Sequence, residues 1–238
     1  MSGIFLVAAK RTPFGAFGGS LKGFSATDLG VVATQAALQQ ANHLDPALID
    51  NVFFGNVIQS SADAAYLSRH VALRSGCQQK TPCLTINRLC GSGFETVILG
   101  ANSIKVGDAR IVLCGGSENM SDAPMAVSGN DARWGVKLGA GMNMRDSLWD
   151  GLTDSYSKTP MGVTAENLAK KYNITREVRC NCDCWNILCA EKCKILRFSF
   201  VTSCFLDFFL PENPRNATNL HYEVSKHGRK RRKLVFLT

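Results

Sequence analysis

The sequence lacks the features that would place the chain across a membrane or in the secretory route. An apolar stretch at residues 195–210 covers 16 residues and is interrupted by Arg197 and Asp207, whereas a transmembrane helix needs roughly 20. The apolar segment at residues 4–9 is too short for a signal peptide, and no basic stretch precedes it. We therefore expect no membrane span and no disulfides.

Glycine is scarce in the final 61 residues, which hold 1 of the 21 glycines but 6 of the 10 cysteines. Charge changes at the same place. Residues 1–177 have 16 Lys and Arg against 14 Asp and Glu, whereas residues 178–238 have 11 against 5. Two unlike sequences therefore meet near residue 177. The tail cysteines lack paired C-x2-C spacing with matching histidines, so we expect no metal site.

Basic residues gather in two further places. Residues 228–233 contain five basic side chains, a pattern found in nucleic-acid contacts and nuclear addresses, although a solvated terminus is the simpler interpretation. We therefore expect no nucleic-acid partner. The first 27 residues contain Lys10, Arg11 and Lys22 and no acid, a bias shared with organelle import signals, but they form no convincing amphipathic helix. The residues alone leave import open.

Apolar patterning predicts strands that alternate with helices over residues 1–116. We expect strands at residues 4–9, 52–58 and 110–114 and an extended apolar run at residues 82–89. We expect helices at residues 27–40, 64–74 and 93–106, the first capped by Thr27. This alternation is typical of an α/β domain with a mixed, largely parallel sheet and helices on both faces. Residues 117–156 are polar and glycine-rich, too long for an ordinary connection. We expect a partial loop domain at residues 117–177.

Cys90 stands where the apolar run at residues 82–89 meets a helix. Such a turn presents a nucleophile outward, with the first helical N–H groups pointing toward what it attacks, and the helix dipole favours the reactive thiolate. Gly91 and Gly93 have no side chains, so an acyl group can approach closely and its oxyanion can accept from amides. The pattern predicts acyl transfer through Cys90. On spacing alone, a buried, space-filling cysteine is the alternative.

The segment NRLCGSG at residues 87–93 closely resembles the thiolases. Four further segments resemble thiolase segments in the same order: AKRTPFG at 9–15, GNV at 55–57, CGGSENMS at 114–121 and MGVTAEN at 161–167. The resemblance covers about three-quarters of the chain and ends near residue 177. It identifies the amino-terminal half of a thiolase, followed by an unrelated, cysteine-rich and basic tail at residues 178–238 that we expect to be poorly ordered.

The resemblance implies a thiolase-like fold and an acyltransferase of fatty-acid β-oxidation. A cysteine, here Cys90, takes an acyl group from a 3-oxoacyl-CoA, releases acetyl-CoA and passes the acyl group to a second CoA. Coenzyme A is then a substrate, and no other cofactor is implied. Met161, by its place in its motif, lines the acyl pocket. Resemblance to the mitochondrial members implies the mitochondrial matrix and a homo-oligomer.

Thiolases resemble two copies of one α/β unit, with most acid–base groups on the second copy. Residues 91–238 contain no Asn-Glu-Ala-Phe, no Gly-His-Pro and no late Cys-x-Gly. We therefore expect this chain alone to be inactive in thiolysis. The alternative function is a non-catalytic truncated isoform or fragment that associates with full-length thiolase subunits. We also expect the helix after Cys90 to expose an apolar face and the sheet to lack its last strand.

Overall fold

A computed structural model describes residues 3–178 and 232–237 of the chain. These residues form two compact units, one of residues 3–152 with 232–237 and the other of residues 153–178. The first unit contains β1 (Ile4–Lys10), α1 (Ala26–Gln40), η1 (Pro46–Leu48), β2 (Asn51–Gly55), η2 (Ala64–Tyr66), α2 (Leu67–Arg74), β3 (Cys83–Ile86), α3 (Ser92–Val106), β4 (Ile111–Gly116), η3 (Met120–Asp122), β5 (Met125–Val127), α4 (Gly129–Arg133), β6 (Met144–Asp146), α5 (Ser147–Leu152) and β9 (Arg232–Leu237). The second contains β7 (Thr153–Asp154), β8 (Thr159–Pro160) and α6 (Met161–Lys171). The domain boundaries predicted from composition stay a prediction.

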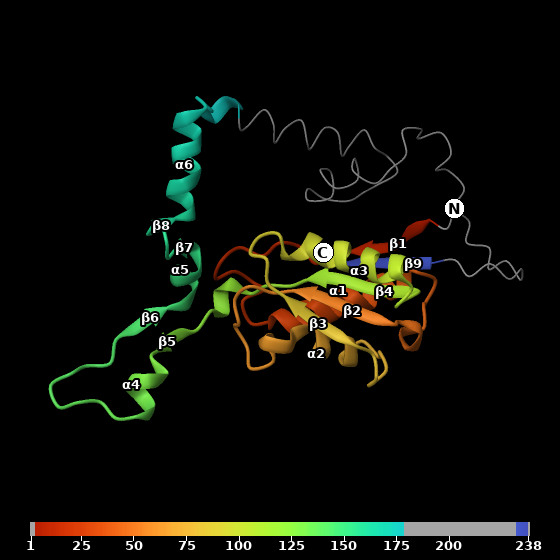
Figure 1. The fold of residues 1–238 in the computed structure, drawn as a ribbon, viewed down its shortest axis with the longest axis horizontal. Coiled ribbons are helices and arrows are strands. Elements are labelled where there is room, and N and C mark those ends of the chain that lie inside the picture. Colours follow the sequence, from red (N-terminus) through yellow and green to blue (C-terminus); the bar gives the residue numbers. More distant parts are fainter. Residues whose placement is uncertain (1–2, 179–231, 238) are drawn as a thin grey trace, which may run out of the picture. The chain divides into compact units, whose positions relative to one another are not determined.

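Five strands form one sheet in the order β1-β9-β4-β2-β3, and every neighbouring pair is parallel (Figure 1). The α/β prediction is therefore confirmed. The expectation that the sheet lacks its last family strand stays a prediction, but the tail supplies a strand of its own: β9 lies between β1 and β4, with Arg232 opposite Ile4 and Lys233 opposite Ile111. Both neighbours need partners for their backbone groups, and the sequence LVFL at residues 234–237 has high β-propensity.

The tail predictions concern mostly residues outside the described part of the chain. The expected disorder of residues 178–238, the apolar stretch at 195–210 and the tail cysteines all fall there, apart from Val178 and β9. The basic run at residues 228–233 reaches the described part only through Arg232 and Lys233, which begin β9. The backbone of these two residues belongs to the sheet, and the interpretation as a solvated basic terminus stays a prediction.

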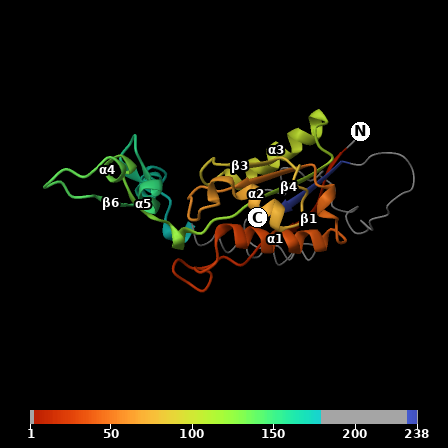
Figure 2. The ribbon, with the colours of Figure 1, turned by 90° about the horizontal axis from the view of Figure 1, so that it is seen from below.

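The two faces of the sheet carry different helices, α1 and α2 on one face and α3 on the other (Figure 2). Strand side chains alternate accordingly. Val52 and Phe54 of β2 pack in the larger cluster with α1 and α2, whereas Phe53 packs with Ile104 of α3. The main core therefore lies beneath α1 and α2, and the α3 face has a smaller one.

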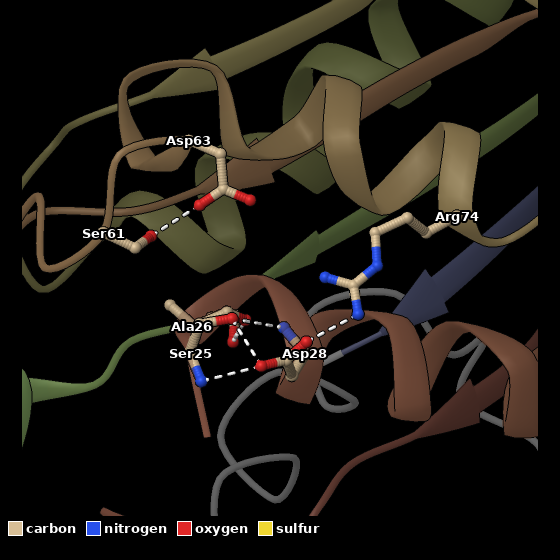
Figure 3. Close-up of polar contacts among 7 residues, drawn as sticks. Ser25, Ala26, Asp28, Ser61, Asp63 and Arg74 are labelled. Carbon is tan, nitrogen blue, oxygen red and sulfur yellow. Dashed lines mark hydrogen bonds and ion pairs between the residues drawn. The ribbon is translucent and has the colours of Figure 1, made fainter. Parts of the chain in front are cut away.

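α1 is capped by Ser25 and not, as we predicted, by Thr27. The Ser25 Oγ accepts a hydrogen bond from the Asp28 N–H at 3.0 Å, and the Asp28 Oδ2 accepts from the Ser25 N–H at 2.9 Å. This reciprocal capping box leaves Thr27 buried in the first turn. The other Asp28 oxygen accepts from Arg74 of α2 at 2.6 Å, so the cap also ties the two helices together (Figure 3).

α3 contacts the sheet through one narrow stripe. Its buried residues recur at every fourth position, as Ser92, Thr96, Gly100 and Ile104. Three of these are small, which lets the helix approach the strands closely. The opposite side exposes apolar side chains, among them Phe94, Ile98 and Val106. The prediction that this helix exposes an apolar face is confirmed.

Residues 117–152 contain only short elements, including an antiparallel pair formed by β5 and β6. In the second unit, β7 and β8 pair and lead directly into α6. Among the described helices, none combines the length and apolar character needed to cross a bilayer.

Candidate active site

Cys90 lies in the turn between the end of β3 at Ile86 and the start of α3 at Ser92. Its side chain is exposed, whereas Cys77 and Cys114 are buried and Cys83 is intermediate. The predicted position at the beginning of a helix is confirmed. The turn therefore offers one accessible thiol among the four described cysteines.

The other three thiols are held in the protonated form by their surroundings. Burial raises the pKa of Cys77 to about 12, and burial also raises the pKa values of Cys83 and Cys114. The reactive species is the thiolate, so these three groups are poor nucleophiles at neutral pH. We therefore interpret these three residues as structural cysteines.

Leu89, the residue before Cys90, has a φ of 52°, in the left-handed region. A non-glycine residue in this conformation costs about 1–2 kcal/mol, and three side-chain hydrogen bonds hold the turn. The Asn87 Oδ1 accepts from the Leu89 N–H at 2.9 Å. The Ser92 Oγ donates to the Leu89 carbonyl at 2.6 Å and accepts from the Arg88 N–H at 2.8 Å. The turn resembles the strained strand-to-helix elbow that presents nucleophiles in other enzymes.

Gly91 and Gly93 differ in what surrounds them. A Cβ at Gly91 would lie 2.9 Å from the Phe94 ring and 3.3 Å from the Arg88 carbonyl oxygen, whereas a Cβ at Gly93 would meet nothing within 4 Å. The Gly91 N–H donates to the Arg88 carbonyl at 3.1 Å. In this conformation that amide closes the turn, so it would have to leave the carbonyl to bind an oxyanion. The helix surface at Gly93 is open to a ligand.

The amino end of α3 rests directly on the glycines that end two strands. A Cβ at Gly55 would lie 2.7 Å from the Ser92 Cβ and 2.9 Å from the Ser92 carbonyl carbon, and a Cβ at Gly116 would lie 3.5 Å from the Gly93 Cα. Real Cβ atoms do not tolerate the first two distances. Gly55 therefore allows the approach that fixes the position of the Cys90 turn against the sheet.

Arg88 is also fixed within this turn. Its guanidinium forms an ion pair with Glu95 and lies over the Phe94 ring, 5.7 Å from the ring centroid. Arg88 is mostly exposed, so the pair contributes little to stability. It does orient the arginine along the first turn of α3.

Met161 is the first residue of α6 and is 45% exposed. It belongs to the second unit, whereas Cys90 belongs to the first. Its role in an acyl pocket therefore stays a prediction.

The described part contains two histidines. His70 lies in α2 and His43 follows α1, and both helices pack on the face of the sheet opposite to α3. His221 and His227 lie outside the described residues. Within residues 3–178 and 232–237, no cluster of three His, Cys, Asp or Glu side chains is placed to hold a metal ion.

A cavity of about 340 Å³ opens at the other edge of the sheet, lined by Ile49, Gln78, Thr81 and Arg110 among others. These residues adjoin the amino ends of β2, β3 and β4, whereas Cys90 follows the carboxyl end of β3. No described cysteine lines the cavity, so it is separate from the Cys90 chemistry.

Residues 4–183 match the family described as "Thiolase, N-terminal domain". The chain belongs to the thiolase family. It is 56% identical over 183 residues to the mitochondrial 3-ketoacyl-CoA thiolase of Mus musculus, an alignment that covers 77% of this chain and 45% of the relative. It is 41% identical over 177 residues to a probable acetyl-CoA acyltransferase of Staphylococcus aureus strain COL, covering 74% and 44%.

The fold agrees with the family. The crystal structure of human mitochondrial 3-ketoacyl-CoA thiolase in complex with CoA matches with a TM-score of 0.69 at 53% identity, covering 77% of this chain and 45% of that one. The predicted thiolase-like fold is therefore confirmed, and the relatives' names agree with the predicted acyltransferase class. The chain spans about 45% of the length of the relatives that it matches.

Proposed function

We propose that this chain carries the acyl-accepting half of a thiolase reaction, with Cys90 as the nucleophile. The Cys90 thiolate attacks the 3-oxo carbonyl of a 3-oxoacyl-CoA, and the bond between C2 and C3 breaks. The departing enolate takes a proton and leaves as acetyl-CoA, while Cys90 keeps the acyl group as a thioester. A second CoA thiolate then takes the acyl group and frees the cysteine.

The observation that carries the proposal is the exposure of Cys90 on a strained turn at the amino end of a 15-residue helix. The dipole of a helix of this length favours an anion at its first turn. The open surface at Gly93 supports close approach of the thioester, and Gly91 lets the turn pack against Phe94. Met161 would contact the acyl chain.

Coenzyme A is a substrate in this proposal, and neither a metal ion nor another cofactor takes part. Support comes from the related human structure, which is a complex with CoA. We place the chain in the mitochondrial matrix because relatives at 52–56% identity are named mitochondrial. We also expect it to form a homo-oligomer, as inferred for the family from the sequence.

A direct test is mass spectrometry of the full chain after brief exposure to acetyl-CoA. We expect one acetyl group on the peptide that contains Cys90, no label in Cys90→Ala, and loss of the label when free CoA is added. Cys83→Ala is the matched control because Cys83 is the next most accessible described thiol, and it should keep full labelling. Labelling spread equally between Cys83 and Cys90, or absent from both, would contradict the proposal.

Complete thiolysis also needs a positioned acid or base, which typically contributes 10²- to 10⁴-fold in rate. The proposal therefore predicts that the chain alone cleaves acetoacetyl-CoA at least about 10²-fold more slowly than an intact thiolase. Acetyl-CoA formation measures this directly. Turnover equal to that of an intact thiolase would show that the missing family motifs are dispensable.

The alternative function is a non-catalytic chain that associates with full-length thiolase subunits. It is favoured by the exposed apolar side of α3, including Phe94, Ile98 and Val106, since uncovered apolar surface promotes association. Mixing with intact enzyme distinguishes the two functions. Co-purification together with loss of the intact enzyme's activity would favour the alternative, and acyl labelling of Cys90 would favour the first.

A further inference from the structure

We propose that Glu118 is a positioning residue for Cys90: its carboxylate fixes the backbone of residues 56–58, which in turn hold the Cys90 turn through Asn87. The inference rests on the proposed role of Cys90 and adds a residue from a different strand end. Glu118 follows β4, residues 56–58 follow β2, and the Cys90 turn follows β3. Carboxyl ends of parallel strands meet at one edge of a sheet, which brings the three segments together.

The Glu118 carboxylate gathers three N–H donors from one short segment. Its Oε2 accepts from the Val57 N–H at 2.8 Å. Its Oε1 accepts from the Ile58 N–H at 3.2 Å and from the Asn56 Nδ2 at 3.0 Å. Hydrogen bonds to an ionised acceptor are about twice as strong as neutral ones. The carboxylate therefore determines the path of the chain after β2.

Two hydrogen bonds connect this segment to the Cys90 turn. The Asn56 N–H donates to the Ile86 carbonyl at 3.1 Å, at the last residue of β3. The Asn87 Nδ2 donates to the Val57 carbonyl at 3.4 Å, while the Asn87 Oδ1 accepts from the Leu89 N–H at 2.9 Å. The side-chain amide of Asn87 thus donates a hydrogen bond to residues 56–58 through its Nδ2 and accepts one from the left-handed Leu89 through its Oδ1.

The carboxylate is chemically suited to this place, and its amide analogue is not. Glu118 is a pure acceptor in its ionised form, which matches three converging N–H groups. Burial raises its pKa, an effect that the hydrogen bonds from Val57, Ile58 and Asn56 oppose. Glu118→Gln keeps the shape but turns an NH₂ group toward N–H donors. It therefore disturbs residues 56–58 without creating a cavity.

The test measures the rate at which iodoacetamide alkylates each cysteine of the full chain, resolved by peptide mass spectrometry. We expect Glu118→Gln and Asn87→Ala each to slow alkylation of Cys90 several-fold. If both act through one connection, the double variant is no slower than the slower single variant. Cys77 and Cys114 are buried and should stay protected, which separates a local change at Cys90 from general loosening of the fold.

Asp50→Asn is the matched control. The Asp50 Oδ2 also accepts two backbone N–H groups, from Arg110 at 2.8 Å and Ile111 at 3.1 Å. It lies before β2, at the other edge of the sheet. We expect Asp50→Asn to lose a comparable amount of thermal stability. The rate at which iodoacetamide alkylates Cys90 should nevertheless stay unchanged in this variant.

An unchanged alkylation rate of Cys90 in Glu118→Gln would overturn the inference. A faster rate would also overturn it, because it would indicate a direct effect of the Glu118 charge. The third contrary result is a double variant in which the effects of the two single variants multiply. Asn87 is exposed, so Asn87→Ala keeps the test decisive if the Glu118 variant does not fold. An unchanged Cys90 rate in Asn87→Ala would then overturn the inference. Alkylation requires no acyl-CoA, whereas acetyl labelling of the unaltered chain tests the function itself, so either proposal can fail alone.

Discussion

Leu89 places a branched side chain in a backbone conformation that usually belongs to glycine. Its side chain is 65% exposed, so little burial offsets the conformational cost. Hydrogen bonds that join Leu89 to Asn87, which accepts, and to Ser92, which donates, hold the turn instead. Strain of this kind is often concentrated at functional sites, and here it immediately precedes the exposed thiol.

Replacing Leu89 tests how much strain the turn contains. Leu89→Gly should unfold at a higher urea concentration than Leu89→Ala, with a difference of about 1 kcal/mol, because alanine keeps the left-handed penalty and glycine does not. Equal unfolding midpoints for the two variants would show that the surroundings already remove the strain.

Glu118 should make stability depend on pH in a defined direction. Burial raises its pKa, so the folded chain binds this proton more tightly than the unfolded chain. The stability that the proton on Glu118 adds to the folded chain is fully present below the pKa of this carboxyl in the unfolded chain. It is lost as pH rises through the pKa of the carboxyl in the folded chain. Relative to Glu118→Gln, the unaltered chain should therefore lose stability as pH rises from the pKa of an unfolded glutamate, about 4.3, into the range above it. Urea unfolding across this range measures the difference, and a constant difference would contradict the expectation.

At the scale of elements, the amino end of α3 lies close to the sheet because the strand residues that it contacts are glycines. Gly55→Ala should destabilise the fold by about 1–3 kcal/mol, as overpacking does, because its Cβ would lie 2.7 Å from the Ser92 Cβ. It should also slow Cys90 alkylation, because α3 must move. Gly23→Ala is the control, since a Cβ there meets nothing within 4 Å. If both alanine variants behave alike, the close approach at Gly55 does not position the turn.

The α1 cap gives an independent test of local structure. Ser25→Ala removes the acceptor for the Asp28 N–H and should cost about 1 kcal/mol. Ser25→Thr keeps a capping hydroxyl and is the matched control, whereas Thr27 is buried and its replacement would also remove packing. Thermal denaturation compares the two variants, and equal midpoints for Ser25→Ala and Ser25→Thr would contradict the assignment of Ser25 as the cap.

Apolar periodicity predicted the strands β1 to β4 and the three long helices, with several of their ends to within one residue. The helix expected at residues 93–106 is α3 at Ser92–Val106, and the strand expected at 4–9 is β1 at Ile4–Lys10. The cap at Ser25 was missed although Ser25 and Asp28 have capping-box spacing. Leu89 was missed because leucine does not indicate a left-handed residue. Glu118 was missed because its partners lie about 60 residues away in the sequence.

At the scale of the molecule, β9 joins the end of the described chain to its beginning. It supplies the only partner of β1 among the described strands and also pairs with β4. Sequence reasoning missed it because a six-residue strand after an unlike segment carries no sign of its partners. Parallel strands that pair can be far apart in sequence. Only the three-dimensional fold shows between which two strands such a strand lies.

Leu234→Pro tests whether the sheet depends on β9. Proline removes a backbone donor from an interior strand, so the variant should be at least about 2 kcal/mol less stable than Leu234→Ala, which keeps that donor. Hydrogen exchange should also show lost protection in β1. Unchanged protection of Ile4–Lys10 would mean that β1 does not need this partner.

The place of β9 also sets an order of events during synthesis. β1 leaves the ribosome first but has no strand beside it until β9 has been translated, long after β2, β3 and β4 can pair. Closing such a distant contact is slow, so β1 stays without a strand partner among the described strands until the residues of β9 have been added.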